Sequence, residues 1–282
     1  MNINKPGKAI KVKKQTFTKQ YIFSQLEAMG APRSSIVLVH SSLRSVGETE
    51  GGAVGLLDAF IEYFTSDGGL LCIPTHTWDN LKKEITLDVR SPENCLGAFS
   101  TVAASDKRGY RTENPTHSMV IFGDRERAEK FAEGEKAVET PTSPDSCYGG
   151  LFREKGYVLL VGVAHNRNTY LHCVAEMLGL PNRMEDKIRT VRVKRETGEV
   201  CERRFSLYKT DYTDDISRRF VKYETAFRYH GCIRDGFIGN APTQLCDAKK
   251  MKDTVELIWK NSCGKDPLLD EEPIEQRFYC VK

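Results

Sequence analysis

The sequence lacks long apolar runs and the cysteine pairs of disulfide-rich or zinc-binding domains. No stretch approaches the roughly 20 apolar residues that a membrane-spanning helix needs. The nine cysteines are an odd number without a C-x-x-C pair, which argues against a disulfide framework and a zinc ribbon. No apolar signal-peptide core is present near the N-terminus. We therefore expect reduced thiols, no membrane association and a cytoplasmic location.

Motifs of several common enzyme classes are also absent. The glycine-rich stretch "GETEGGAVG" (residues 47–55) has no G-K-[ST] and does not fit G-x-G-x-x-G, which excludes the usual nucleotide-binding loops. There is no H-E-x-x-H, the helical histidine pair of many zinc enzymes, and no G-x-S-x-G. A net charge of +3 is too small to indicate a nucleic-acid partner.

What is present is the composition of an ordinary globular protein. The 282 residues are 39% hydrophobic and 29% charged, enough for a sizeable core. Up to Met29 there are six lysines and one acid, Glu27. This pattern predicts either a solvated N-terminus or a positively charged surface beside the binding site of an anionic ligand. Without a linker or a repeat, we expect a basic segment at 1–17 and one domain at 18–282. The oligomeric state stays open, with a homodimer among the options.

The apolar pattern alternates between strands and helices. Nearly continuous apolar runs predict buried strands at 35–42, 70–74, 118–123 and 157–163. Helical spacing predicts helices at 19–30, 51–69, 94–105, 124–134, 167–183, 214–227 and 243–262. Alternation around a Thr-Gly turn predicts a β-hairpin at 188–207. Strand–helix–strand order indicates an α/β domain with a mixed sheet.

Polar residues and histidines gather where the predicted strands end. Three segments follow strands: "HSSLRSVGETEGG", "PTHTWDN" and "AHNRNTYLH". Five of the six histidines lie in or near them or in "NPTHS", namely His40, His76, His117, His165 and His172. Open α/β sheets bind ligands beyond the carboxyl ends of their strands, so we expect the site here. The long irregular segment 75–95 is expected to line it.

Residues 41–46 suit a ligand that carries amides and phosphates. Ser41, Ser42 and Ser45 offer hydroxyl groups before a predicted helix, and Arg44 adds a fixed positive charge. The alternative is a well-capped turn without a ligand.

His172 and Glu176 lie four residues apart on one face of the predicted helix 167–183. The pair could bind a metal with a third ligand such as His165 or His76, act as a general base with its orienting acid, or form a buried hydrogen bond. Cysteine catalysis is another option, with Cys147 or Cys173 paired to an imidazole.

Four acids are candidates for holding a cationic substrate, and for each the alternative is a solvated loop or a helix cap. They are Asp79, Asp211, Asp214 and Asp215.

The chain resembles the aminoglycoside 3-N-acetyltransferase family, whose fold is not that of the GNAT acetyltransferases. The resemblance rests on "LVHSSLRSVG", "GGLLCIPTHTW", "RTENPTHSMVIFG" and "TPTSPDSCYGGLFREKGYVLLVGVAHNRNTYLH", and ends weakly at "GFIGNAPTQL". These motifs occur in the family's order over roughly residues 18 to 245.

The resemblance implies a single-domain, three-layer α/β/α enzyme that moves an acetyl group from acetyl-CoA to an amine of an aminoglycoside or related amino sugar. His172 would be the base, with Glu176 orienting it and no metal involved. The substrate acids would include Asp79, Asp211 and Asp215, with His76 nearby. The coenzyme contacts would be Ser41, Ser42, Leu43, Arg44, Ser45, Val46, Arg111 and Ser118.

Two positions depart from the family pattern. Members usually carry an acid three residues after the histidine, where this chain has Ala175 and places Glu176 one step later. Many members read R-S-x-H-P where this chain reads "RTENP", with Asn114 in place of the histidine. The alternatives to an acetyltransferase are a metal- or cysteine-dependent hydrolase in the same cleft and a non-catalytic binding protein.

Overall fold

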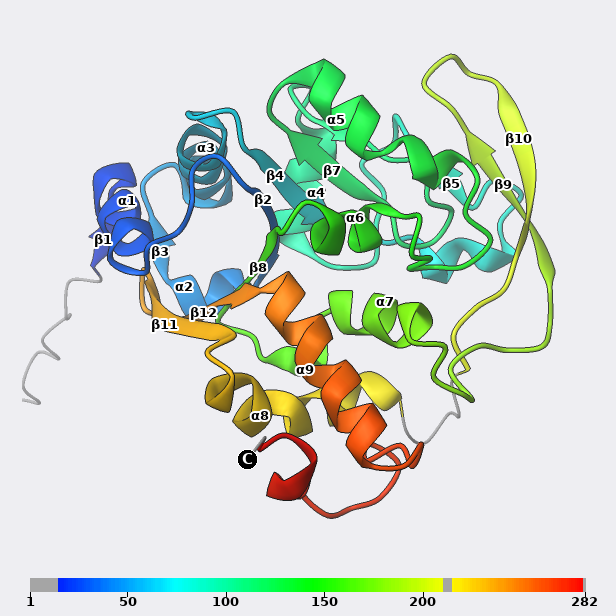
Figure 1. The fold of residues 1–282 in the computed structure, drawn as a ribbon. Coiled ribbons are helices and arrows are strands. Elements are labelled where there is room, and N and C mark those ends of the chain that lie inside the picture. Colours follow the sequence, from blue (N-terminus) through cyan, green and yellow to red (C-terminus); the bar gives the residue numbers. More distant parts are fainter. Residues whose placement is uncertain (1–14, 210–214, 281–282) are drawn as a thin grey trace, which may run out of the picture.

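A seven-stranded mixed sheet forms the centre of the computed structural model, which describes residues 15–209 and 215–280 (Figure 1). Its strands are β2 (Ile36–Ser41), β4 (Leu70–Pro74), β6 (Tyr110–Arg111), β7 (Met119–Phe122), β8 (Tyr157–Val161), β11 (Ile233–Ile238) and β12 (Ala241–Asp247). They are ordered β11-β12-β8-β2-β4-β7-β6. The inner strands β8, β2 and β4 are parallel, and antiparallel strands flank them on both sides.

Both faces of the sheet are covered, which explains the unbroken apolar runs of its inner strands. Along β2, Val37 and Val39 face one core, and Ile36 and Leu38 face the other. The first core is closed by α1 (Lys19–Ala28), α2 (Leu43–Val46), α3 (Gly52–Thr65) and α4 (Ala98–Ser105). The second is closed by α5 (Arg125–Phe131), α6 (Cys147–Arg153), α7 (Tyr170–Met177), α8 (Glu224–Tyr229) and α9 (Ala248–Asn261). The expected three-layer α/β/α architecture is confirmed.

Most predicted elements are present, but the helix predicted at 243–262 is wrong at its start. Residues up to Asp247 belong to β12, which pairs with both β8 and β11. The side chain of Asp247 then accepts a hydrogen bond from the backbone N–H of Lys250, at 2.9 Å, so α9 begins at Ala248. Strand pairing on both sides overrides the helical spacing of these residues.

Two other differences concern the C-terminal half of the chain. Strand β11 was not expected from the sequence. The helix predicted at 214–227 is a 3₁₀ helix, η4 (Ile216–Tyr223), followed by α8. The remaining 3₁₀ helices are η1 (Trp78–Lys82), η2 (Glu133–Lys136), η3 (His165–Arg167) and η5 (Gln276–Phe278).

A second, three-stranded sheet extends away from the main one. It consists of β10 (Val200–Phe205), β9 (Arg189–Lys194) and β5 (Leu87–Asp88), in that order. Strands β9 and β10 form the hairpin predicted around Thr197 and Gly198, with Val200 opposite Lys194. We call residues 189–205 the hairpin arm; Figure 1 shows it standing apart from the main sheet.

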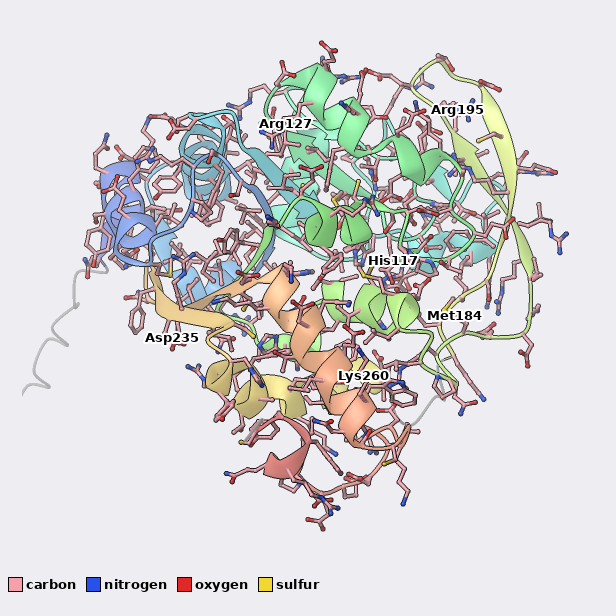
Figure 2. The ribbon with its side chains drawn as sticks, viewed as in Figure 1. His117, Arg127, Met184, Arg195, Asp235 and Lys260 are labelled. Atoms are coloured by element: carbon pink, nitrogen blue, oxygen red, sulfur yellow. The ribbon has the colours of Figure 1, made fainter. Side chains whose placement is uncertain are left out.

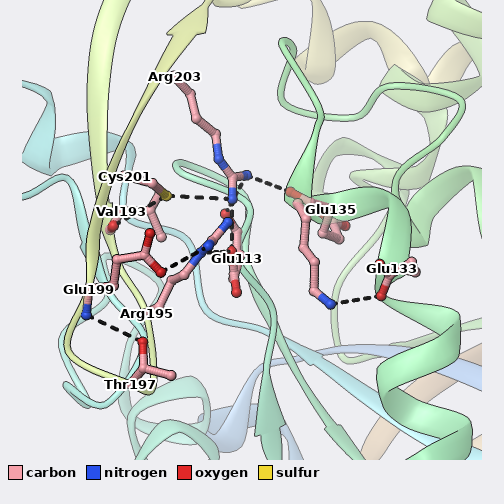
Figure 3. Close-up of polar contacts among 10 residues, drawn as sticks. Glu113, Glu133, Glu135, Val193, Arg195, Thr197, Glu199, Cys201 and Arg203 are labelled. Atoms are coloured by element: carbon pink, nitrogen blue, oxygen red, sulfur yellow. Dashed lines mark hydrogen bonds and ion pairs between the residues drawn. The ribbon is translucent and has the colours of Figure 1, made fainter.

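Ion pairs fasten the hairpin arm to the body of the protein (Figure 3). Glu113 Oε2 lies 2.8 Å from Arg203 Nη2 and 3.1 Å from Arg195 Nε. Arg203 also donates to the backbone carbonyl of Glu135, at 2.6 Å. Beneath these pairs, Val191 and Phe205 of the arm are buried against Val138. The arm is therefore held by a partly buried charge cluster as well as by apolar contacts.

The N-terminal part adds a small parallel pair, β1 (Thr16–Phe17) with β3 (Glu48–Thr49). Residues 1–14 of the expected basic segment lie outside the described residues, and its last two residues form β1. Among the residues that the structure describes, no helix has the length and apolar character to cross a membrane.

Candidate active site

A cavity of about 940 Å³ lies beyond the carboxyl ends of the three parallel strands. Ser41 at the end of β2, Pro74 at the end of β4 and Val163 just after β8 all line it. This is where the sequence predicted the site, because parallel strands bring their carboxyl ends to one edge of a sheet. The irregular segment 75–95 also contributes as expected, through His76, Trp78 and other side chains.

Four of the six histidines line this cavity: His40, His76, His117 and His172. The rings of His76 and His117 are 4.3 Å apart, centroid to centroid, and Figure 2 shows His117 near the middle of the molecule. His165 is elsewhere, fully buried with Nε2 3.2 Å from Glu224 Oε2. The structure thus brings together four of the five histidines that the sequence analysis singled out.

Burial keeps these four imidazoles neutral. It lowers the pKa of His40 to about 4 and that of His117 to about 3. Burial also lowers the pKa of His76 well below its usual value, and the neighbouring histidines add to this effect. A charged imidazole loses its hydration when it is enclosed, so the neutral form is favoured. At pH 7 each ring can therefore accept a proton or a hydrogen bond.

His172 lies in the first turn of α7, between two aromatic rings. The ring of Tyr208 stacks on it at 4.1 Å between centroids with an interplanar angle of 17°. The ring of Phe220 lies 4.8 Å away between centroids, with an interplanar angle of 70°. Burial lowers the pKa of His172 to about 4, while Asp215 raises it and Arg183 lowers it further.

Glu176 does not use its carboxylate on the imidazole as the sequence analysis expected. Oε2 accepts the hydroxyl of Thr140 at 2.5 Å, and Oε1 accepts the hydroxyl and the backbone N–H of Thr142 at 2.6 and 3.2 Å. Thr142 in turn is hydrogen-bonded to the hydroxyl of Tyr208. The direct pairing of Glu176 with His172 is thus replaced by a chain of contacts that ends on the ring stacked against His172.

The predicted coenzyme segment lies at the β2 end of the cavity. Ser41, Ser42 and Leu43 line the cavity, and the Ser45 hydroxyl donates to that of Ser42, at 2.9 Å. Arg44 is exposed to solvent. Val46 is fully buried in the core that α1, α3 and α4 also close, so its side chain is not available to a ligand.

Arg111 and Ser118 are buried behind the cavity wall. Arg111 Nη2 donates to the carbonyls of Thr75 and Glu93, at 2.8 and 2.9 Å. The hydroxyl of Ser118 donates to the same Thr75 carbonyl at 2.8 Å. These two side chains hold the segment after β4 onto the sheet, and neither lines the cavity.

Of the four residues predicted to hold a substrate, two line the cavity, one does not, and one lies outside the described residues. His76 and Asp215 line the cavity, and His76 Nε2 is hydrogen-bonded to the hydroxyl of Tyr148 at 2.9 Å. Asp215 also caps η4 by accepting the backbone N–H of Ser217 at 2.9 Å. Asp79 is exposed and does not line the cavity. Asp211 lies outside the described residues, as does Asp214.

Several lining residues were missed by sequence reasoning. They are mainly apolar or aromatic, with some charged groups: Trp78, Leu81, Leu96, Phe99, Arg167, Glu185, Leu207, Tyr208 and Lys209. The polar and aromatic character of segment 75–95 was a signal for Trp78. No motif marks Tyr208, which closely follows the hairpin arm and reaches the site only through the tertiary fold.

The alternatives of a metal site and of a catalytic cysteine find no supporting geometry. Within residues 15–209 and 215–280, no group of three or more histidine, cysteine or acidic side chains is placed to hold a metal ion. Cys147 and Cys173 are fully buried, and burial raises the pKa of each thiol well above its usual value. A buried neutral thiol is a poor nucleophile.

Asn114, the second departure from the family pattern, has a structural role. Its side-chain oxygen accepts the backbone N–H groups of His117 and Thr116, at 2.9 and 3.2 Å. Its amide donates to the carbonyl of Pro141, at 2.9 Å. Asn114 therefore shapes the turn that carries His117 into the cavity.

The fold and the cavity define a three-layer α/β protein with a histidine-rich site at the carboxyl ends of its parallel strands. The chain belongs to the aminoglycoside 3-N-acetyltransferase family, whose family model matches residues 38–258. Its relatives include aminoglycoside N(3)-acetyltransferases IV and III, and the chain is accordingly an enzyme of the acyltransferase class.

Two relatives illustrate the extent of the similarity. Aminoglycoside N(3)-acetyltransferase IV of Salmonella sp is 26% identical over 259 residues, which cover 91% of each chain. The SPbeta prophage-derived aminoglycoside N(3')-acetyltransferase-like protein YokD of Bacillus subtilis (strain 168) is 26% identical over 175 residues. That match covers 55% of this chain and 63% of the relative.

Solved structures of similar proteins share the fold. A mutant of aminoglycoside acetyltransferase AAC(3)-IVa in complex with a gentamicin superimposes with a TM-score of 0.73 at 22% identity, covering 90% of this chain and 93% of that one. AAC-IIIb in a binary complex with CoASH gives 0.70 at 20% identity, covering 90% and 99%.

Proposed function

We propose that this protein transfers the acetyl group of acetyl-CoA to an amine of an aminoglycoside or a related amino sugar, by direct transfer in a ternary complex. The observation that carries the proposal is that His172 and the segment Ser41–Leu43 line one cavity. Family membership supports the reaction type, and the gentamicin complex of AAC(3)-IVa and the CoASH complex of AAC-IIIb support the two substrates.

In the proposed reaction His172 is the general base. The neutral amine attacks the thioester carbonyl, a C–N bond forms, and the C–S bond breaks to release the CoA thiol. His172 accepts the proton that the amine nitrogen loses as the C–N bond forms. Burial favours the neutral imidazole that this step requires, and Asp215 stabilises the imidazolium that results.

The substrate end of the cavity combines charge with apolar surface. Asp215 and Glu185 supply negative charge for a cationic amino sugar, and Trp78 and Tyr208 supply aromatic faces. Such faces suit a cationic substrate, because a ring quadrupole attracts cationic groups. We assign the acceptor amine to this end and the pantetheine of the coenzyme to the end formed by Ser41, Ser42 and Leu43.

The test is release of the CoA thiol from acetyl-CoA with a panel of aminoglycosides and amino sugars, followed by mass spectrometry of the acetylated products. The His172→Ala variant is expected to lose about 10²–10⁴-fold in kcat, the usual contribution of a general base. The matched control is His230→Gln, because His230 is hydrogen-bonded to the Tyr279 carbonyl and does not line the cavity.

Two outcomes would refute the proposal. One is the absence of acetylated product with every amine although the protein is folded. The other is full activity of His172→Ala, which would remove the base from the mechanism.

A further inference from the structure

Tyr208 stacks on His172 in the cavity. The aromatic rings around His172 come from segments that are far apart in the sequence. His172 belongs to α7, Tyr208 follows the hairpin arm, and Phe220 comes from η4. Tyr208 lies almost parallel to the imidazole, at 4.1 Å, whereas the plane of Phe220 is inclined to it by 70° at 4.8 Å. Of these two rings, Tyr208 is therefore the one that stacks face to face with the imidazole.

Tyr208 is held in this orientation by a chain of hydrogen bonds. Its hydroxyl group is bonded to the hydroxyl of Thr142, and Thr142 donates to Glu176 Oε1 at 2.6 Å. Thr140 donates to the other carboxylate oxygen, at 2.5 Å. With the Thr142 hydroxyl proton directed at Glu176, the Tyr208 hydroxyl is the donor in its bond to Thr142. Successive hydrogen bonds of this kind polarise and reinforce one another.

We propose that Tyr208 is a positioning residue that supports the imidazolium of His172, and that Glu176 acts on His172 through Thr142 and Tyr208. This inference rests on the proposed function, in which His172 takes up a proton. The face of an aromatic ring carries partial negative charge and attracts a cation, most strongly where water is excluded. The stacked ring also restricts rotation of the imidazole, which favours one productive orientation.

The proposal accounts for the shift of the acid from position 175 to position 176. An acid that bonds the imidazole directly must reach one of its nitrogens. In this chain the carboxylate instead anchors a phenol, and the phenol contacts the imidazole through its face. Burial raises the pKa of Tyr208 well above its usual value, so the phenol stays protonated and remains both a neutral platform and a hydrogen-bond donor.

Other charged groups also act on His172 and must be separated from the effect of Tyr208. Asp215 raises its pKa and Arg183 lowers it. His76 and His117 are close enough for a charge on His172 to lower their own pKa values. Because the Tyr208 variants described below leave all four groups in place, a change in the pKa of His172 reports the loss of the aromatic face.

The experiment is an NMR titration of ¹⁵N-labelled histidine side chains in the wild-type protein and in three variants. Tyr208→Leu removes the ring, and the His172 pKa is expected to fall by about one unit, equivalent to a tenfold loss of imidazolium stability. Tyr208→Phe keeps the ring without its anchor and is expected to show a smaller fall. Glu176→Gln keeps an acceptor for Thr142 and is expected to stay near the wild-type value.

Kinetics with the best acceptor give a second readout. Tyr208→Leu is expected to lower kcat about tenfold or more while leaving KM for acetyl-CoA within about twofold. Glu176→Ala is expected to lower kcat, and Glu176→Gln to restore most of it. If Tyr208→Leu does not fold, Thr142→Val tests the anchor instead, because it removes the hydrogen bond to Tyr208 and keeps the ring. It is then expected to show the smaller fall in the His172 pKa that Tyr208→Phe shows, together with a lower kcat.

An unchanged His172 pKa in a folded Tyr208→Leu protein would overturn the inference. A kcat loss without a pKa change would do so as well, since it would assign Tyr208 to substrate contact alone. Failure of the proposed function is distinguishable, because it would appear as activity retained by His172→Ala, while the titration still reports the coupling of Tyr208 to His172.

Discussion

The imidazole of His40 is enclosed near the end of β2, and its Nε2 atom finds no hydrogen-bond partner among the described residues. The side chain is only 8% exposed. Burying a polar atom without a partner costs free energy that an apolar side chain of similar size would not cost. His40 also lines the cavity beside Ser41, so replacing its side chain changes the wall of the site.

His40→Leu is therefore expected to leave the free energy of unfolding at pH 7 unchanged or slightly higher, while lowering activity. Urea denaturation of the ligand-free protein, with kinetics alongside, checks this. His117→Leu is the matched control, because His117 Nδ1 is bonded to the Thr116 hydroxyl at 2.9 Å and its loss should cost about 1–2 kcal/mol. Equal destabilisation by both substitutions would contradict the prediction.

At the residue scale, the sequence predicted some side chains of the site and not the hydrogen-bond partners of others. The histidines of the site were predicted, because strand ends and histidines coincide in the sequence and the sheet rule brings strand ends together. The partners of Glu176 were not predictable. Thr140 and Thr142 lie in an irregular segment before α6, and helical spacing says nothing about which segment packs against a helix from outside.

At the scale of elements, the hairpin arm leads directly into residues that line the cavity. Strand β10 ends at Phe205, and Leu207, Tyr208 and Lys209 shortly after it line the cavity. The position of Tyr208 over His172 therefore depends on how firmly the arm is attached to the body. Glu113 is central to that attachment, because it pairs with both Arg195 and Arg203.

Glu113→Gln is expected to destabilise the protein by about 3 kcal/mol, because the side chain of Arg203 is only 8% exposed and loses its counter-charge. Hydrogen exchange of residues 189–205 should accelerate more than that of the central sheet, and kcat should fall. The two measurements together separate loosening of the arm from global unfolding.

The control for this prediction is Glu199→Gln. Glu199 pairs with Arg195 at 3.1 Å but is 61% exposed, and exposed pairs contribute less than about 1 kcal/mol. If Glu113→Gln destabilised the protein no more than Glu199→Gln, the ion pairs of Glu113 would not be responsible for attaching the hairpin arm to the body.

The elements themselves were predicted unevenly, and the reason is physical. Buried runs such as residues 36–41 and 70–74 identify central strands directly, since no solvated face interrupts them. Strands β11 and β12 are edge-side strands with mixed burial. Their strand state comes from the pairing of β12 with β8 and of β11 with β12, contacts that local spacing does not contain.

For the whole molecule, the buried histidines predict sensitivity to acid. His40, His76, His117 and His172 all have a pKa below the ordinary 6.5 in the folded chain, because of burial. Between about pH 6.5 and pH 4 the unfolded chain therefore binds protons that the folded chain does not. Unfolding free energy consequently rises with pH in this window and is lost on acidification.

The size of the effect follows from the number of protons. Each such histidine adds at most about 1.4 kcal/mol per pH unit. Burial raises the pKa of Glu135 to about 7 and also that of Glu176, and these two acids act in the opposite direction. We expect a net loss of about 3 kcal/mol per pH unit between pH 6 and pH 5.

Urea denaturation at several pH values between 7 and 5 measures this slope. His40→Leu should reduce this slope by the contribution of one histidine, at most about 1.4 kcal/mol per pH unit. This variant provides an internal control. A free energy of unfolding that stays constant over this range would contradict the assignment of neutral, buried histidines.

The division of the cavity between two parts of the chain has a consequence for how such proteins diversify. In the proposed function, the coenzyme binds at the end built by the inner strand β2 and the turn after it, and β2 is fixed by packing on both faces of the sheet. Tyr208 and its neighbours at the other end directly follow the hairpin arm, which lies outside the main sheet. With the two substrates placed as proposed above, we expect changes in that hairpin to alter the choice of acceptor amine without disturbing the coenzyme end. We therefore expect related proteins to keep a constant coenzyme site and to differ in acceptor specificity through this one peripheral segment.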